Sequence, residues 1–292
     1  METIEKKRLL YKSKVEYMDG PGVYTMNHVQ GCAHGCRYPC YAYLAAKRFG
    51  TASSEGEWMT PKPVEDVIGK LAREIDAKRK EPVERVHMCF TTDPLPWSVG
   101  CSNRRTMELI HADTLRAVGE LNARGIPVTM LTKGTLPRIE RDFCEGDSFT
   151  ILRASSGVAA SVYSQELHPD NLFGISLVTP CDEFRSAWEP GAAPVEFRVR
   201  SLRIMHEEGC RTWVSMEPFP TPAIQLETCG QTWDAVEVLS LVPFVDRVVF
   251  GRWNYGPKIT AEEREWYRRQ AEAVRKWCKR WGAECHIKKG TE

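Results

Sequence analysis

Three cysteines lie close together near the start of the chain, in the stretch GCAHGCRYPCYAY at residues 31–43. Within the set Cys32, Cys36 and Cys40, neighbours are separated by three residues. Thiolates at such short spacing are typical ligands of a zinc ion or of an iron–sulfur cluster. Structural zinc sites and electron-transfer clusters both take four ligands, so the set is one ligand short.

Two kinds of metal site would account for three cysteines. In the first, His34 or His28 completes a Cys3His zinc site. In the second, the thiolates bind a four-iron cluster and leave one iron open, as catalytic zinc leaves one position open. A loop of unliganded buried thiols is a third, less specific interpretation. The residues alone leave all three open.

The composition is that of a folded globular protein, with 42% hydrophobic and 27% charged residues among 292. A net charge of +1 gives no overall attraction to nucleic acid or membrane. The sequence contains no apolar run long enough to span a bilayer, and its charged start lacks the apolar segment of a signal peptide. The cysteine count of eleven is odd, which argues against a disulfide framework. We therefore expect a cytoplasmic protein with reduced thiols and no membrane association.

Strand-like and helical segments alternate along the chain. Strands are expected at 23–30, 86–90, 126–132, 172–179, 210–217 and 245–251. Helices are expected at 64–80, 104–124, 195–209, 233–242 and 262–281. This alternation predicts an α/β fold with a parallel sheet and outer helices.

Six strand–helix units are too few for a closed eight-unit barrel, so the expected architecture is a partial (β/α)6 TIM-type barrel. The sequence shows no linker that would divide it. We expect a single domain over 1–292, with its core at about 23–251 and a C-terminal helical extension at 252–292. The segment 145–170 is irregular and is expected to be a surface insertion.

The cysteine loop resembles that of the radical S-adenosylmethionine (SAM) enzymes, in particular the spore photoproduct lyase-like branch. That branch has the pattern G-C-x-H-x-C-x-Y-C-Y-A, which this chain matches at Gly31, Cys32, His34, Cys36, Tyr38, Cys40, Tyr41 and Ala42. The family spacing is C-x3-C-x2-C, whereas this chain has one more residue, with Pro39 where the third cysteine is usual. Further motifs of the branch follow in order at Thr92-Asp93-Pro94, Thr132-Lys133, Arg141-Asp142, Ser176-Leu177 with Thr179, and Glu189-Pro190 with Arg198.

The resemblance implies that Cys32, Cys36 and Cys40 hold a [4Fe-4S] cluster whose open iron binds SAM. An electron donor such as flavodoxin or ferredoxin would reduce the cluster. Reductive cleavage of SAM then gives a 5′-deoxyadenosyl radical that removes hydrogen from a substrate, which the sequence does not identify.

Reactive groups of such barrels lie at the carboxyl ends of the strands. The residues expected to contact SAM or substrate are Tyr41, Thr92, Asp93, Lys133, Ser176, Arg198 and Glu217. Lys133 is expected to pair with the carboxylate of SAM, because a point cation suits an anion in a water-poor site. Glu217 is expected to bind a ribose hydroxyl or the substrate.

The lyase itself uses a cysteine immediately before the Ser/Thr-Asp turn as its hydrogen donor, and Phe90 takes that place here. Cys89 and Cys101 are the candidate donors instead. Strand alternation predicts that Cys89 faces away from the side of Phe90. Photoproduct lyase activity is therefore not expected.

Two alternatives to the radical SAM interpretation stay open. One is a non-catalytic zinc- or iron–sulfur-binding module, and the other is a lyase that repairs or modifies nucleic acid. The basic residues near the C-terminus could meet phosphates, but glutamates are interspersed among them. The near-zero net charge does not favour a nucleic-acid substrate.

Overall fold

The computed structural model describes residues 2–97, 103–141, 149–152, 167–254 and 259–292. Within these residues, eight strands form one sheet in the order β1-β2-β5-β6-β9-β10-β11-β12. All of these strands are parallel except β1, which pairs antiparallel with β2. The bounds are β1 Leu10–Lys12, β2 Val23–Met26, β5 Arg85–Met88, β6 Val128–Thr132, β9 Leu172–Ser176, β10 Arg211–Phe219, β11 Arg247–Arg252 and β12 Glu284–Ile287.

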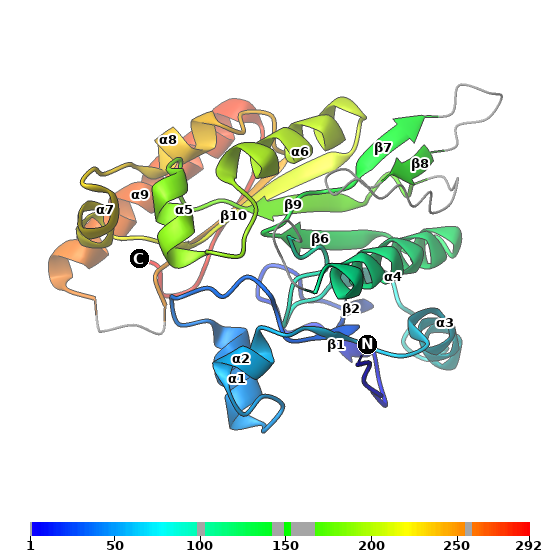
Figure 1. Cartoon of the computed structure of the whole chain (residues 1–292). Coiled ribbons are helices and arrows are strands. Elements are labelled where there is room, and N and C mark those ends of the chain that lie inside the picture. Colours follow the sequence, from blue (N-terminus) through cyan, green and yellow to red (C-terminus); the bar gives the residue numbers. More distant parts are fainter. Residues whose placement is uncertain (1, 98–102, 142–148, 153–166, 255–258) are drawn as a thin grey trace.

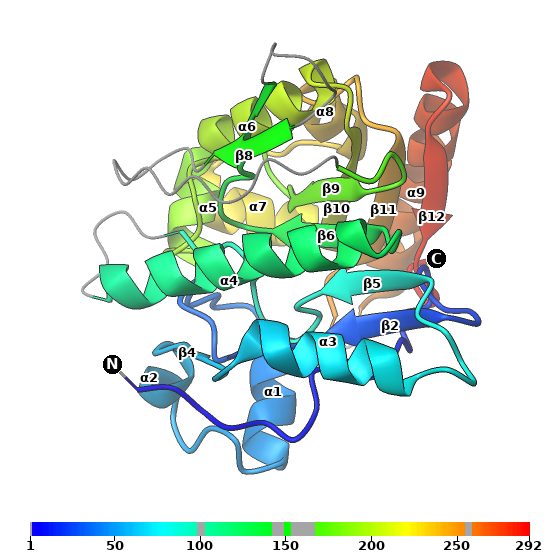
Figure 2. The same cartoon turned by 90° about the vertical axis from the view of Figure 1, so that its right-hand side faces the viewer.

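Helices cover the outer side of this sheet (Figure 1). Figure 2 shows α3 and α4 in front of the sheet and α9 beside β12. The helices are α1 Tyr41–Arg48, α2 Glu55–Trp58, α3 Val67–Ala77, α4 Arg104–Ala123, α5 Asp182–Trp188, α6 Val195–Glu207, α7 Pro222–Cys229, α8 Ala235–Ser240 and α9 Ala261–Trp281. The expected partial barrel is confirmed as an open, mostly parallel sheet with flanking helices.

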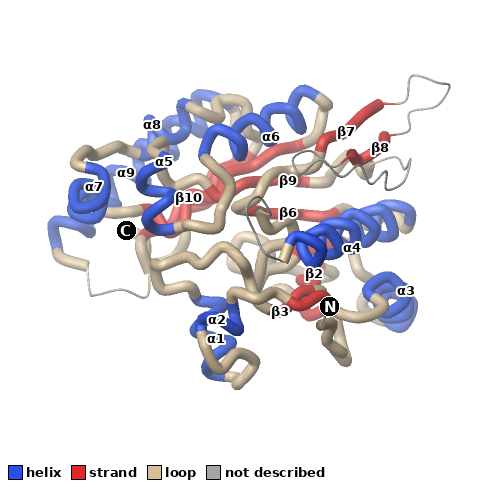
Figure 3. Tube along the Cα trace, in the orientation of Figure 1, coloured by secondary structure: helices blue, strands red, loops and turns tan. Residues whose placement is uncertain are grey.

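Two short hairpin-like pairs lie outside the main sheet. β3 (Val29–Gln30) pairs antiparallel with β4 (Lys62–Pro63), and β7 (Arg138–Arg141) pairs antiparallel with β8 (Phe149–Leu152). Figure 3 shows β7 and β8 projecting from one end of the molecule. The expected insertion at 145–170 falls largely outside the described residues, as does Asp142 of the Arg141-Asp142 motif.

The strands differ from the expectation in three places. The single strand expected at 23–30 is divided, because residues 29–30 leave the main sheet and pair with β4. The edge strands β1 and β12 were not expected. β12 has only four residues, ECHI, and owes its place to pairing with β11. The residues after 251 therefore contain a strand of the sheet as well as the expected helix.

The strands separate two layers of buried side chains. Val86 and Met88 of β5 belong to the main core beneath the helices, whereas His87 between them faces the inner side. Trp213 fills part of the inner layer and donates from Nε1 to the Met130 carbonyl at 2.9 Å. A Cβ at position 174 would lie 2.3 Å from that nitrogen, so only glycine allows Trp213 this position.

The N-terminal segment before β2 joins the two edges of the open sheet. Glu16 accepts hydrogen bonds from His286 Nε2 at 2.9 Å and from the Lys289 amide at 2.8 Å, next to β12. The Tyr17 carbonyl accepts one from Arg247 Nη2 at 2.7 Å. Within the described chain, none of the helices combines the length and apolar character that a membrane span requires.

Candidate active site

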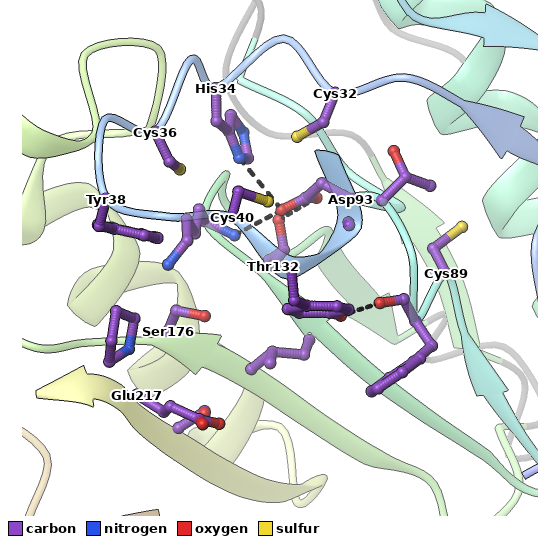
Figure 4. A pocket seen from close by; sticks show the side chains of 18 of the residues that line it. Cys32, His34, Cys36, Tyr38, Cys40, Cys89, Asp93, Thr132, Ser176 and Glu217 are labelled. Atoms are coloured by element: carbon purple, nitrogen blue, oxygen red, sulfur yellow. Dashed lines mark hydrogen bonds and ion pairs between the residues drawn. The ribbon is translucent and has the colours of Figure 1, made fainter. Parts of the chain in front are cut away.

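A cavity of about 270 Å³ lies where the parallel strands end. Its wall consists of the cysteine loop, the start of α1, the ends of β5, β6, β9 and β10, and residues near the C-terminus. Figure 4 shows Cys32, Cys36 and Cys40 above the strand ends that carry Ser176 and Glu217. We call this space the strand-end cavity. The carboxyl ends of parallel strands are the usual place for the reactive groups of a barrel.

All three cysteines of the loop line this cavity. The loop is fastened at two points to the connection between α5 and α6. The Arg37 amide donates to the Trp188 carbonyl at 2.8 Å, and the Gly191 amide donates to the His34 carbonyl at 2.8 Å. A Cβ at position 191 would lie 2.4 Å from the Ala33 carbonyl oxygen, so this approach requires glycine.

Tyr38 anchors the part of the loop that contains the additional residue Pro39. Its hydroxyl donates to Glu189 Oε1 at 2.9 Å, and its ring packs edge-on against Trp253 with centroids 5.5 Å apart. The longer loop thereby keeps Cys36 and Cys40, on either side of Tyr38, on the cavity wall.

The cysteine set fits an iron–sulfur cluster by its donor chemistry. Burial raises the pKa of the Cys36 thiol to about 12 and that of Cys32 well above its usual range. Without a cation, these thiols would stay protonated at neutral pH, whereas a bound metal deprotonates a coordinating thiol. Among the described residues, no three His, Cys, Asp or Glu side chains are arranged to hold a single metal ion.

The two histidines considered as zinc ligands are occupied by other contacts. His34 Nε2 accepts from the Trp97 amide at 3.3 Å, and its Nδ1 lies 3.5 Å from Asp93 Oδ2. His28 contacts Thr114 Oγ1 with Nε2 and Cys89 Sγ with Nδ1. Neither imidazole therefore offers a free nitrogen to complete a Cys3His site.

Asp93 connects the ends of β5 and β6. Its Oδ1 accepts from Thr132 Oγ1 at 2.7 Å and from the Leu95 amide at 2.8 Å, while Oδ2 accepts from the Lys133 amide at 2.8 Å. Figure 4 marks several of these contacts. Asp93 lines the cavity, and its carboxylate oxygens accept hydrogen bonds from backbone and side chains of the wall.

Lys133 lines the cavity and forms an ion pair with Glu189. Glu189 belongs to the Glu189-Pro190 motif of the sequence but was not among the expected site residues. The Arg198 guanidinium contacts the second carboxylate oxygen of Glu189 at 2.9 Å. Burial would raise the pKa of Glu189, but the cations of Lys133 and Arg198 lower it to about 2. Burial would lower the pKa of Lys133, and the Glu189 carboxylate raises it instead.

The structure does not bring Arg198 into the cavity wall. Its side chain is buried behind the wall and donates to the carbonyls of Ala193 at 2.9 Å and Ser176 at 2.8 Å. Arg198 thus positions the end of β9 and the carboxylate of Glu189 from behind. Ser176 itself lines the cavity.

Thr92 and Tyr41 both line the cavity, and each also forms a hydrogen bond between two parts of its wall. The Thr92 hydroxyl donates to the Gly31 carbonyl at the start of the cysteine loop. The Tyr41 hydroxyl donates to the Phe90 carbonyl, and the two rings pack with centroids 5.3 Å apart. These contacts hold the cysteine loop against the end of β5.

Glu217 near the end of β10 lines the cavity together with Lys288 and Asn254, two residues that the sequence did not indicate. Lys288 Nζ contacts the carboxylate oxygens of Glu217 at 2.6 and 2.7 Å, and Asn254 Nδ2 donates to it at 3.0 Å. Lys288 follows β12 directly. In the sequence, Lys288 belongs to the short segment ECHIKK after Gly282, for which no strand was predicted.

Cys89 and Phe90 both line the cavity, but their side chains pack in different clusters, Cys89 with Ile110 and Phe90 with Trp213, which agrees with the expectation that the two face different sides. The regular strand stops just before these residues, because β5 ends at Met88 and Cys89 has a left-handed backbone with φ of 55°. Cys101, the other candidate donor, lies outside the described residues.

A chain of hydrogen bonds orients the thiol of Cys89. Thr114 Oγ1 donates to the Pro94 carbonyl at 2.7 Å, so it accepts from His28 Nε2 at 2.8 Å. His28 Nδ1 is then the acceptor for the Cys89 thiol at 3.3 Å. Burial raises the pKa of Cys89 above its usual range, which keeps the S–H bond intact.

No protein-family model matches the sequence, and no curated protein matches it. Among solved structures, the fold resembles spore photoproduct lyase complexed with dinucleoside spore photoproduct, with a TM-score of 0.56 and 11% sequence identity. The match covers 97% of this chain and 80% of that chain. A mutant of that lyase with bound AdoMet and dinucleoside spore photoproduct matches over the same shares, with a TM-score of 0.55 and 11% identity. At such identity, the likeness shows the fold.

Proposed function

We propose that this protein is a radical SAM enzyme that cleaves SAM reductively and uses the resulting radical on a substrate bound in the strand-end cavity. One observation carries the proposal: the three cysteines of one loop share a cavity with polar groups from the ends of successive parallel strands. The fold, which is that of spore photoproduct lyase, supports the same interpretation.

Cys32, Cys36 and Cys40 would hold a [4Fe-4S] cluster, and SAM would bind in the strand-end cavity. When bound and reduced by a donor such as flavodoxin or ferredoxin, this pair supplies the reductive cleavage of SAM to a 5′-deoxyadenosyl radical. The chain's own residues bind and orient these groups and exclude water.

Two ion-paired residues of the cavity wall, Lys133 and Glu217, could contact SAM or substrate. Lys133 Nζ is held 2.7 Å from Glu189 Oε1, so its position is fixed before a ligand arrives. We propose that it binds the carboxylate of SAM. Glu217, whose carboxylate is oriented by Lys288 and Asn254, would accept hydrogen bonds from ribose or substrate hydroxyls.

We propose Cys89 as the hydrogen donor within the cavity. Cys89 is one of the residues that line the cavity, and its buried, protonated thiol donates to His28 Nδ1 at 3.3 Å. A protonated thiol can give a hydrogen atom, whereas a thiolate would instead act as a nucleophile or metal ligand. Apolar wall residues, such as Phe90 and Leu131, keep water from competing as a partner.

A lyase acting on nucleic acid is the second candidate, because a structural neighbour is described as complexed with a dinucleoside photoproduct. The charges on α9 do not favour long nucleic acids. Arg268 pairs with Glu265 at 2.7 Å, and Lys276 pairs with Glu272 at 2.8 Å. Basic side chains that are already paired with carboxylates release fewer counterions when they bind phosphates, so they contribute less to nucleic-acid affinity.

Anaerobic reconstitution with iron and sulfide, followed by SAM and dithionite, tests the proposed function. We expect iron uptake and release of 5′-deoxyadenosine, and we expect Cys36→Ala to abolish both. Cys285→Ser alters an exposed cysteine outside the cavity and serves as the control that keeps both. Retention of zinc without iron uptake or SAM cleavage would favour the non-catalytic metal-binding module.

A further inference from the structure

The buried imidazole of His87 has no hydrogen-bond partner in the described part of the chain. His87 lies on β5 between Thr25 of β2 and Thr129 of β6, is 3% exposed and lines the strand-end cavity. Its Nδ1 is shielded from solvent and unpaired. Buried polar atoms are normally satisfied, and an exception in a cavity wall indicates that a bound molecule supplies the partner.

Two further polar groups without a described protein partner face the same cavity. The hydroxyls of Ser176 on β9 and Ser215 on β10 line it, and both residues are less than a tenth exposed. Among the residues that the structure describes, neither hydroxyl makes a hydrogen bond. Three strands thus each place one unsatisfied polar side chain on the inner face of the sheet.

Apolar side chains surround these polar groups. The ring of Phe90 packs edge-on against His87 with centroids 6.1 Å apart, and Leu131 and Tyr17 complete the wall nearby. Apolar walls with a few convergent polar groups are the usual composition of a small-molecule site. We refer to His87, Ser176, Ser215 and these apolar neighbours as the His87 subsite.

The charge state of His87 restricts what the subsite accepts. Burial, with a contribution from the Arg247 cation, lowers the pKa of His87 to about 4, so the ring is neutral at physiological pH. A neutral imidazole has one N–H donor and one acceptor nitrogen. An ionised ligand group would lose its hydration here without an opposite charge on the ring.

We propose that the His87 subsite binds the substrate, and that it selects an uncharged group with an apolar body and one hydroxyl or amide that hydrogen bonds to the His87 ring. This inference rests on the proposed function, which needs a second molecule besides SAM in the cavity. His87 and Cys89, the proposed hydrogen donor, both line this cavity. His87 then determines specificity. An analogue that lacks the polar group leaves the buried ring without a hydrogen-bond partner and therefore binds more weakly.

Phenol and toluene test the inference on the full chain, because they share size and an apolar ring but only phenol has a hydroxyl. Dissociation constants are measured by saturation-transfer NMR for the parent and for His87→Phe. We expect the parent to prefer phenol by about tenfold, which corresponds to one hydrogen bond of about 1.4 kcal/mol. We expect His87→Phe to lose this preference. His206→Phe, which changes an exposed histidine outside the cavity, should retain it.

A second variant covers the case in which His87→Phe does not fold. His87→Gln keeps a neutral donor and acceptor and should retain part of the preference for phenol. An unchanged ratio in the His87 variants, or binding of neither compound, overturns the subsite. Assays of 5′-deoxyadenosine run on the same samples separate the two proposals. A phenol preference without SAM cleavage refutes only the radical function, and cleavage without the preference refutes only the subsite.

Discussion

Lys133 Nζ lies 2.7 Å from Glu189 Oε1, and this ion pair joins the end of β6 to the segment after α5 across 56 residues of sequence. The Glu189 side chain is 1% exposed and also meets the Arg198 guanidinium and the Tyr38 hydroxyl. One carboxylate therefore holds a lysine of the cavity wall, the cysteine loop and the helix α6. Its removal should affect all three.

Glu189→Gln leaves the buried Arg198 and the partly buried Lys133 without their anionic partner. We expect the free energy of unfolding to fall by about 3 kcal/mol, since breaking one side of a buried ion pair leaves uncompensated charge. Urea denaturation monitored by circular dichroism measures the loss. Glu265→Gln, on the exposed face of α9, should change stability by less than about 1 kcal/mol. Equal stabilities for the two variants would contradict the role given to Glu189.

Gly191→Ala should impair cluster binding without touching a cysteine. The added Cβ would lie 2.4 Å from the Ala33 carbonyl oxygen and 2.9 Å from the His34 Cα, so the cysteine loop must shift. We expect iron content after reconstitution to drop well below that of the parent. Gly56→Ala is the matched control, because a Cβ there meets no atom within 4 Å. Full iron content in Gly191→Ala would show that the cysteines tolerate displacement of the loop.

Cys89→Ala tests the proposed hydrogen donor without knowledge of the substrate. In D2O the Cys89 thiol exchanges to S–D, and SAM cleavage without substrate should then place deuterium in 5′-deoxyadenosine. We expect this deuterium to fall to background in Cys89→Ala, as measured by mass spectrometry. Cys181→Ala removes a buried thiol outside the cavity and should leave the labelling unchanged. Persistent labelling in Cys89→Ala would assign the donor to another group.

Acid should destabilise the fold through His28 and His87. Burial is the main cause that lowers the pKa of these residues, to about 3 and about 4 respectively. Between about pH 6.5 and pH 4, the unfolded chain therefore binds protons that the folded protein excludes. Stability is full above this window and falls as the pH drops through it.

The variant His87→Phe isolates the contribution of one of these rings. Between about pH 7 and pH 5, we expect it to lose about 2 kcal/mol less stability than the parent, because it has no ring to protonate on unfolding. Urea denaturation at the two pH values gives the difference. Identical acid sensitivity in parent and variant would mean that the pKa of His87 is the same in the folded and the unfolded protein.

Local patterns in the sequence predict much of the fold. The six central strands and the long helices α4 and α9 follow from apolar periodicity and from glycines at helix ends, and their bounds agree with the structure to within a few residues. The edge strands β1 and β12 could not be found this way. They are short and partly polar, and pairing with a neighbouring strand stabilises them more than their own residues do.

The sequence by itself determined that three closely spaced cysteines lack a fourth ligand, and that polar residues follow the strands. Spacing along the chain and the period of a strand suffice for both conclusions. Only the tertiary structure decided that Arg198 lies behind the wall, that Lys288 near the C-terminus reaches Glu217, and that Cys89 is one of the lining residues of the cavity. These placements depend on which strand ends meet and on one left-handed residue after β5. Such contacts join residues far apart in the chain, and no local pattern records them.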